Sequence, residues 1–152
     1  MRVLCCLDGS NIEQLSKAVS SMLRADALTI GLIHVIDSEP HGELERQRER
    51  FLSHPPLPPH RRDQIRQAET ETAQEILQEG SRHFPNAELL RREGRPEREI
   101  VQSAAEWGAD LIVICSRSPR GGGPTIGPKS VGHVARFVLD HAPCPVLLVR
   151  AY

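Results

Sequence analysis

The chain alternates between short apolar runs and longer segments with helical spacing of their apolar residues. Five short runs predict strands, at residues 2–7, 27–36, 87–91, 111–115 and 146–149. The segments between them predict helices at 12–23, 63–84, 96–105 and 129–141. Because most of the strands are continuous apolar runs, each is expected to be buried on both of its faces.

Turn and capping residues place the ends of these elements. Ser10 is expected to cap the first helix, with Glu13 completing a capping box, and Pro96 suits the first turn of a helix. The segment 37–62 carries a charged block and then the string HPPLPPH, whose prolines oppose both helix and central strand. We interpret the chain as one domain, 1–152, with an irregular, proline-rich insertion at 37–62.

Alternation of strand and helix predicts an α/β fold of the doubly wound, Rossmann-like kind, with helices on both faces of the sheet. Right-handed crossovers favour a mostly parallel five-stranded sheet in the order 3-2-1-4-5. Ligands of such sheets bind beyond the carboxyl ends of the strands, where the winding direction reverses. That point lies between the first and fourth strands, and brings together the loop Asp8-Gly9-Ser10 and the Gly/Pro-rich loop that follows Cys115.

Composition narrows the possible partners. The formal net charge is -1, whereas nucleic-acid binding favours a basic excess, so no nucleic-acid partner is expected. No run of about 18 apolar residues predicts a membrane span, and we expect a cytoplasmic protein. The four cysteines show no metal-ligand spacing and are expected to be buried thiols.

The histidines do not form a recognisable catalytic or metal-binding set. His34 lies in a predicted strand, where a hydrogen-bonded core histidine is the favoured interpretation. His133 and His141 share a predicted helix but stand about two turns apart, too far to share an ion. We expect no metal site and no dedicated enzyme activity, although slow ATP hydrolysis stays open.

Four segments together resemble the universal stress protein family, and they cover nearly the whole chain except 37–62. They are VLCCLDGS, LIHVID, EGRPEREIVQSAAEWGADLIVICSR and SVGHVARFVLDHAPCPVLLVR. The family contains members that bind ATP and members that do not. Binding goes with a glycine pattern after the fourth strand, Gly-x2-Gly-x9-Gly-[Ser/Thr], in which glycines let backbone N–H groups approach the phosphates.

This chain departs from that glycine pattern. Cys115 and Ser118 stand at the first two glycine positions, and Gly132 matches the third but is followed by His133. The intervening loop is also longer than the pattern allows. It carries Gly121-Gly122-Gly123 and the pair Lys129-Ser130, which could still contact a phosphate; Pro128 breaks the register of a Walker A loop. His133 could contact phosphate as a cation or cap its own helix.

The resemblance implies that Asp8 meets the nucleotide and that the backbone of Val35 contacts adenine. The candidate nucleotide-binding residues are Asp8, Gly9, Val35, Cys115, Ser116, Arg117, Ser118, Lys129, Ser130, Gly132 and His133.

Two functions remain open, with a weaker third. The first is a regulatory domain that binds ATP, with or without Mg²⁺, or a related adenine nucleotide; the second is a dimeric stress-response module that binds no nucleotide. The third is an enzyme related to adenine-nucleotide hydrolases. A homodimer through the last strand is expected in both leading cases, with Pro145, Val146, Leu147, Leu148 and Val149 at the interface.

Overall fold

The structure, a computed structural model, describes residues 1–24, 27–38, 58–116 and 131–150. Its elements are β1 (Arg2–Leu7), α1 (Ile12–Met22), β2 (Thr29–Asp37), α3 (Pro59–His83), β3 (Glu88–Gly94), α4 (Pro96–Trp107), β4 (Leu111–Cys115), α5 (His133–His141) and β5 (Val146–Val149). The strands form one sheet in the order β3-β2-β1-β4-β5, and every pair is parallel. This confirms the predicted fold class and strand order.

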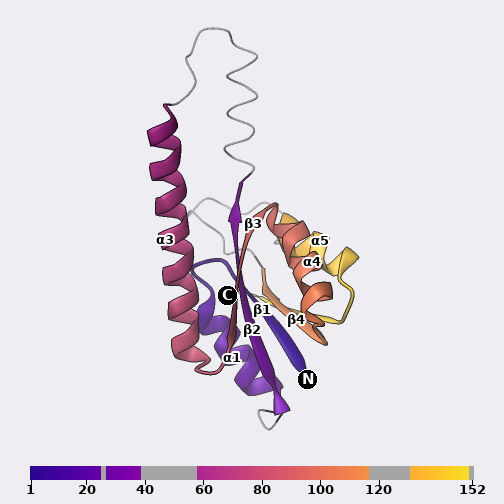
Figure 1. The fold of residues 1–152 in the computed structure, drawn as a ribbon. Coiled ribbons are helices and arrows are strands. Elements are labelled where there is room, and N and C mark those ends of the chain that lie inside the picture. Colours follow the sequence, from indigo (N-terminus) through magenta and orange to yellow (C-terminus); the bar gives the residue numbers. More distant parts are fainter. Residues whose placement is uncertain (25–26, 39–57, 117–130, 151–152) are drawn as a thin grey trace, which may run out of the picture.

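Helices cover both faces of the sheet, α1 and α3 on one side and α4 and α5 on the other (Figure 1). Successive side chains of the central strand β1 point alternately to the two faces of the sheet. Val3, Cys5 and Leu7 pack into the apolar cluster that includes side chains of α1 and α3, whereas Leu4 and Cys6 pack with α4 and α5. Each large apolar side chain buried in this way contributes about 1.5–3 kcal/mol, so the two clusters fix β1 in the middle of the molecule.

Three element boundaries differ by three residues or more from those that the sequence predicts. Helix α3 begins at Pro59, inside the stretch expected to be irregular, because a proline in the first turn forfeits no hydrogen bond. Strand β3 continues to Gly94, since a strand at the sheet edge tolerates charged residues with no apolar pattern. Helix α5 begins at His133, later than the predicted residue 129, because Gly132 has a φ of 95°, which is not helical.

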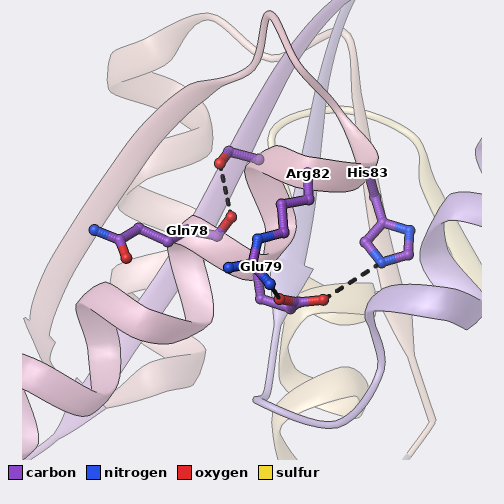
Figure 2. A network of polar contacts seen from close by, with 5 residues as sticks. Gln78, Glu79, Arg82 and His83 are labelled. Carbon is purple, nitrogen blue, oxygen red and sulfur yellow. Dashed lines mark hydrogen bonds and ion pairs between the residues drawn. The ribbon is translucent and has the colours of Figure 1, made fainter.

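The last turns of α3 carry a polar network on the molecular surface. The Glu79 carboxylate lies between Arg82 and His83: Arg82 Nη1 donates to Oε2 at 2.7 Å, and His83 Nε2 lies 3.8 Å from Oε1 (Figure 2). Exposed ion pairs of this kind contribute little to stability. The inward side of the same helix segment, with Leu77 and Gly80 buried, is what holds α3 on the sheet.

Candidate functional site

A cavity of about 420 Å³ lies at the carboxyl edge of the sheet, at the point where the winding direction reverses between β1 and β4. It is lined by the ends of β1, β2 and β4, by the β1–α1 loop, and by the first turns of α4 and α5. The lining residues are Cys6, Leu7, Asp8, Ser10, Asn11, Ile33, His34, Val35, Pro96, Ile100, Ile114, Cys115, Val131, Gly132, His133, Val134 and Ala135. Its volume falls within the range of small-molecule sites, about 300–1,000 Å³.

The β1–α1 loop presents a carboxylate to this cavity. Asp8 Oδ1 accepts hydrogen bonds from the Ser10 backbone N–H at 2.8 Å and from Ser10 Oγ at 3.0 Å. Gly9 has a φ of 91°, a conformation that strains residues with a Cβ. The loop therefore holds Asp8 in place while its side chain remains exposed.

Asn11, which sequence reasoning missed, holds this loop in place through two hydrogen bonds. The residue is 4% exposed. Its Oδ1 accepts from the Asp8 backbone N–H at 3.1 Å, and its Nδ2 donates to the Cys6 carbonyl at 2.9 Å. The predicted Ser10 cap is wrong: Asn11 holds the N-cap position of α1 and makes no side-chain capping bond. The hydroxyl of Ser10 serves Asp8 instead.

Strand β2, the neighbour of β1 in the sheet, supplies a second wall of the cavity. Val35 lines the cavity where the resemblance predicts a backbone contact with adenine. Its neighbour His34 is half-buried and lies with Nδ1 2.9 Å from the Leu7 carbonyl oxygen. This hydrogen bond confirms a satisfied histidine, but His34 also faces the cavity, so the interpretation as a core residue is incomplete.

The third wall comes from the first turns of α4 and α5. Gly132 is the N-cap of α5 with φ 95° and ψ 160°, a conformation that is essentially restricted to glycine. His133 follows it, exposed, and its Nε2 lies 3.5 Å from Oε1 of Glu97. The same Glu97 oxygen accepts a hydrogen bond from Arg95 Nε at 3.0 Å.

Glu97 is a buried carboxylate, which sequence reasoning missed. Its side chain is only 6% exposed. Burial favours the neutral acid, but the backbone N–H of Glu97 and the charges of Arg95 and His133 outweigh it and hold the pKa below its usual range. The available clue was an acidic residue directly after Pro96, in the first helical turn, where a carboxylate is favoured.

The thiols near the cavity are poor nucleophiles. Burial, reinforced by the Asp8 charge, raises the pKa of Cys115 to about 11, and burial raises that of Cys5 to about 12. The Cys115 thiol, on the neighbouring strand β4, adds to the rise in the pKa of Cys5. Because the thiolate is the reactive form, neither cysteine is prepared for covalent chemistry.

The structure thus brings together Asp8, Val35, Cys115, Gly132 and His133 around one cavity. Gly9 and Ser116 adjoin it, with Ser116 buried and its backbone N–H bonded to the Val149 carbonyl at 2.8 Å. Four further candidates, Arg117, Ser118, Lys129 and Ser130, lie outside the described residues. The predicted dimer residues 145–149 lie on and next to β5, which pairs with β4 at the sheet edge.

Two findings on the described residues bear on other expectations. No group of three His, Cys, Asp or Glu side chains among them is arranged to hold a metal ion. Within the same ranges, no helix combines the length and apolar character that crossing a membrane requires.

The cavity lies at the switch point of a doubly wound sheet, which is where open α/β sheets bind their ligands. The chain belongs to the universal stress protein family, whose profile matches residues 1–150. It is 28% identical over 149 residues to the "Universal stress protein in QAH/OAS sulfhydrylase 3'region" of Thermus aquaticus, with 97% of each chain covered. It is 32% identical over 98 residues to YxiE of Bacillus subtilis, over 62% of this chain and 64% of that protein.

Solved structures share the fold at low sequence identity. The protein MJ0577 superposes with a TM-score of 0.72 at 22% identity, over 99% of this chain and 96% of that one. A universal stress protein family protein from Arabidopsis thaliana with AMP bound gives a TM-score of 0.62 at 17% identity, over 100% and 92%. A universal stress protein in complex with cAMP gives 0.53 at 19% identity, over 100% and 98%.

Proposed function

We propose that this protein is a regulatory domain that binds an adenine nucleotide in the switch-point cavity. The observation that carries the proposal is the convergence of the Asp8 carboxylate, the Val35 backbone and the Gly132 turn on one cavity of ligand size. Two proteins of the same fold, one with AMP bound and one in complex with cAMP, add support.

The walls suit the parts of a nucleoside. Apolar side chains of β2, β4 and α4, namely Ile33, Ile114 and Ile100, offer a surface for the flat face of a base. The Val35 backbone would contact the adenine edge. Asp8 would accept hydrogen bonds from ribose hydroxyls, as acidic residues do in related nucleotide-binding folds; a carboxylate has acceptor positions beyond the two that Ser10 occupies.

The phosphates would lie toward Gly132 and the first turn of α5. A helix N-terminus favours negative charge because its first N–H groups have no partner within the helix. Contacts from Arg117, Ser118, Lys129 and Ser130 stay predictions, as does the choice of ATP over other adenine nucleotides. Mg²⁺ would enter with the phosphates of ATP, since this ion usually keeps several waters and binds through substrate phosphates.

Isothermal titration of AMP, ADP and ATP into the purified protein tests the proposal. Asp8→Asn removes the charge but preserves an acceptor for Ser10, and should weaken binding by about tenfold to a hundredfold, since a hydrogen bond to a charged group contributes about 1.5–3 kcal/mol. Asp63→Asn is the matched control, because Asp63 is an exposed carboxylate on α3 that does not line the cavity.

The alternative is a dimeric interaction module that binds no nucleotide. The departures at Cys115, Ser118 and His133 from the glycine pattern favour it. Absence of binding heat for all three nucleotides would reject the nucleotide proposal in its favour.

Homodimerisation through β5 is a prediction of both alternatives. All four residues of β5 are half-buried, and an edge strand with unpaired backbone groups is a template for pairing with a second copy. Leu148→Glu should convert a dimer to monomers in sedimentation velocity. Leu148 also packs against the α4–α5 cluster, so circular dichroism must first show that the variant is folded; a folded variant that is still dimeric would reject β5 as the interface.

A further inference from the structure

His133 and Glu97 form a pair at the rim of the cavity that the family pattern does not predict. His133 stands where the pattern has Ser or Thr, its side chain is 72% exposed, and it lines the cavity. Glu97, from the neighbouring helix α4, is buried, and its Oε1 lies 3.5 Å from His133 Nε2. An exposed ring is thus held by a buried carboxylate.

The carboxylate decides which ring nitrogen carries a proton. Glu97 is an anion at neutral pH, since its own backbone N–H, Arg95 and His133 lower its pKa against the effect of burial. An anion accepts only, so it favours a proton on His133 Nε2, the nitrogen that faces it. Nδ1 is then the nitrogen that remains for a ligand.

The two charge states of His133 therefore behave differently toward a phosphate. In the neutral ring Nε2 carries the proton and Nδ1 bears a lone pair, which cannot hydrogen-bond a phosphate oxygen because both are acceptors. In the charged ring both nitrogens donate, and Nδ1–H can form a charge-assisted hydrogen bond.

We propose that His133, positioned by Glu97, contacts the phosphate of the bound nucleotide only in its protonated form, so that nucleotide affinity rises as the pH falls. This inference rests on the proposed nucleotide binding and adds its regulation by pH. Histidine is the side chain that changes charge between about pH 5 and about pH 8. His133 would replace a fixed hydroxyl with a contact that the proton concentration controls.

Other ionisable groups face the same space and must be separated from His133. Those that line the cavity are Asp8 from the β1–α1 loop, His34 from β2, and the thiols of Cys6 and Cys115. Burial raises the pKa of both thiols, so they stay neutral through this pH range. His34 is the other histidine that lines the cavity, and its Nδ1 already contacts the Leu7 carbonyl oxygen.

The experiment uses cAMP as the probe, since its phosphodiester keeps one negative charge throughout the range and cannot itself cause a pH dependence. Affinity is measured by isothermal titration between about pH 5 and about pH 8. The wild-type protein should bind about tenfold more tightly at the acidic end, the effect of one charge-assisted hydrogen bond. His133→Gln and His133→Ser should show no such rise, whereas His34→Gln should retain it.

Glu97→Gln tests the positioning role. Without the anion neither tautomer is imposed, so the neutral ring can also donate from Nδ1, and the rise in affinity toward acidic pH should become smaller. An unchanged profile in this variant would reject the role of Glu97.

The remaining outcomes distinguish the two proposals. Tight binding of cAMP with a flat profile in the wild-type protein would overturn the role of His133 and leave nucleotide binding intact. A pH-dependent rise that survives His133→Gln and disappears in His34→Gln would overturn it as well. Absence of binding for cAMP, AMP and ATP at every pH would overturn the proposed function itself.

Discussion

The sheet has an amino edge, where its parallel strands begin, and a carboxyl edge, where they end. Both edges carry charged and aromatic or imidazole side chains, but these side chains have different partners at the two edges. At the amino edge, the Arg2 guanidinium lies 4.1 Å from the centre of the Trp107 ring. The indole N–H donates to Glu88 Oε2 at 2.7 Å, and Asp110 Oδ2 accepts from the Arg2 backbone N–H at 2.7 Å. Charged and aromatic groups there bond to one another.

At the carboxyl edge, polar groups surround a cavity instead. Asp8, His34 and His133 come from three different elements, and each faces the same space. The contacts that these side chains make within the protein fix their own positions; for example, His34 Nδ1 hydrogen-bonds the Leu7 carbonyl oxygen. A cluster of charged groups therefore does not by itself mark a functional site. The charged groups at the amino edge bond to one another, whereas those at the carboxyl edge line a cavity.

The amino edge should affect stability without affecting binding. Trp107→Ala removes a ring that packs against Gly31, where an added Cβ would lie 2.9 Å from Trp107 Cζ2. It also removes the ring that stacks on Arg2 and the N–H that donates to Glu88. We expect the free energy of unfolding to fall by about 3 kcal/mol, as measured by urea denaturation.

Trp107→Phe is the matched control, because it keeps a ring under Arg2 and loses only the indole N–H, at a cost of about 1 kcal/mol. Nucleotide affinity should be unchanged in both folded variants. A tenfold weakening of binding in Trp107→Ala would show that the two edges are coupled.

Asn11 should affect both quantities, because it lies under the cavity. Asn11→Ala leaves the Cys6 carbonyl and the Asp8 N–H without their partner. We expect a loss of about 2 kcal/mol in unfolding free energy and, since Asp8 is no longer fixed, about tenfold weaker nucleotide binding.

Asn86→Ala supplies the baseline for Asn11→Ala, because Asn86 is exposed and remote from the cavity. Binding that stays at the wild-type level in Asn11→Ala would mean that Asp8 does not need this support.

Gly132 tests the backbone of the carboxyl edge. Its φ of 95° with ψ 160° is strained for any residue with a Cβ, so Gly132→Ala should cost about 2 kcal/mol and weaken nucleotide binding by moving the first turn of α5. Gly108→Ala is the control at the amino edge: φ 68° is the left-handed helical region, with no atom near the added Cβ, and the cost should be about 1 kcal/mol. Equal losses of stability would argue against special strain at Gly132.

Most of the fold could be predicted because its cause is local. A continuous apolar run such as 111–115 favours a strand that is buried on both faces. The right-handedness of crossover connections then limits the possible strand orders. Boundaries were wrong where local rules permit two outcomes, as at Pro59, a residue that can end a loop or begin a helix.

The site was less predictable, because its polar residues act through long-range contacts. Asp8 could be named because it follows a predicted strand, and Gly132 because it matches the third glycine of the family pattern. Asn11 and Glu97 were not, since their importance comes from burial against Cys6, Arg95 and His133. No spacing in the sequence encodes that burial.

Two thiols, one at each edge, allow the comparison to be made within a single molecule. Cys115 lines the cavity, and its pKa of about 11 keeps it protonated at pH 8, so labelling by a maleimide should be roughly a hundredfold slower than in the denatured chain. Cys144 precedes β5 at the amino edge and is half-buried, and burial raises its pKa as well. Rates can be followed for each cysteine by mass spectrometry of peptides.

Saturating nucleotide should slow the labelling of Cys115 further and leave that of Cys144 unchanged, because Cys115 lines the cavity and Cys144 does not. Cys144 is thus the internal control within the same molecule. Equal protection of both thiols would indicate a general gain in stability on binding, by mass action. Cys115 labelling that is unaffected by a nucleotide known to be bound would place the ligand away from this cavity.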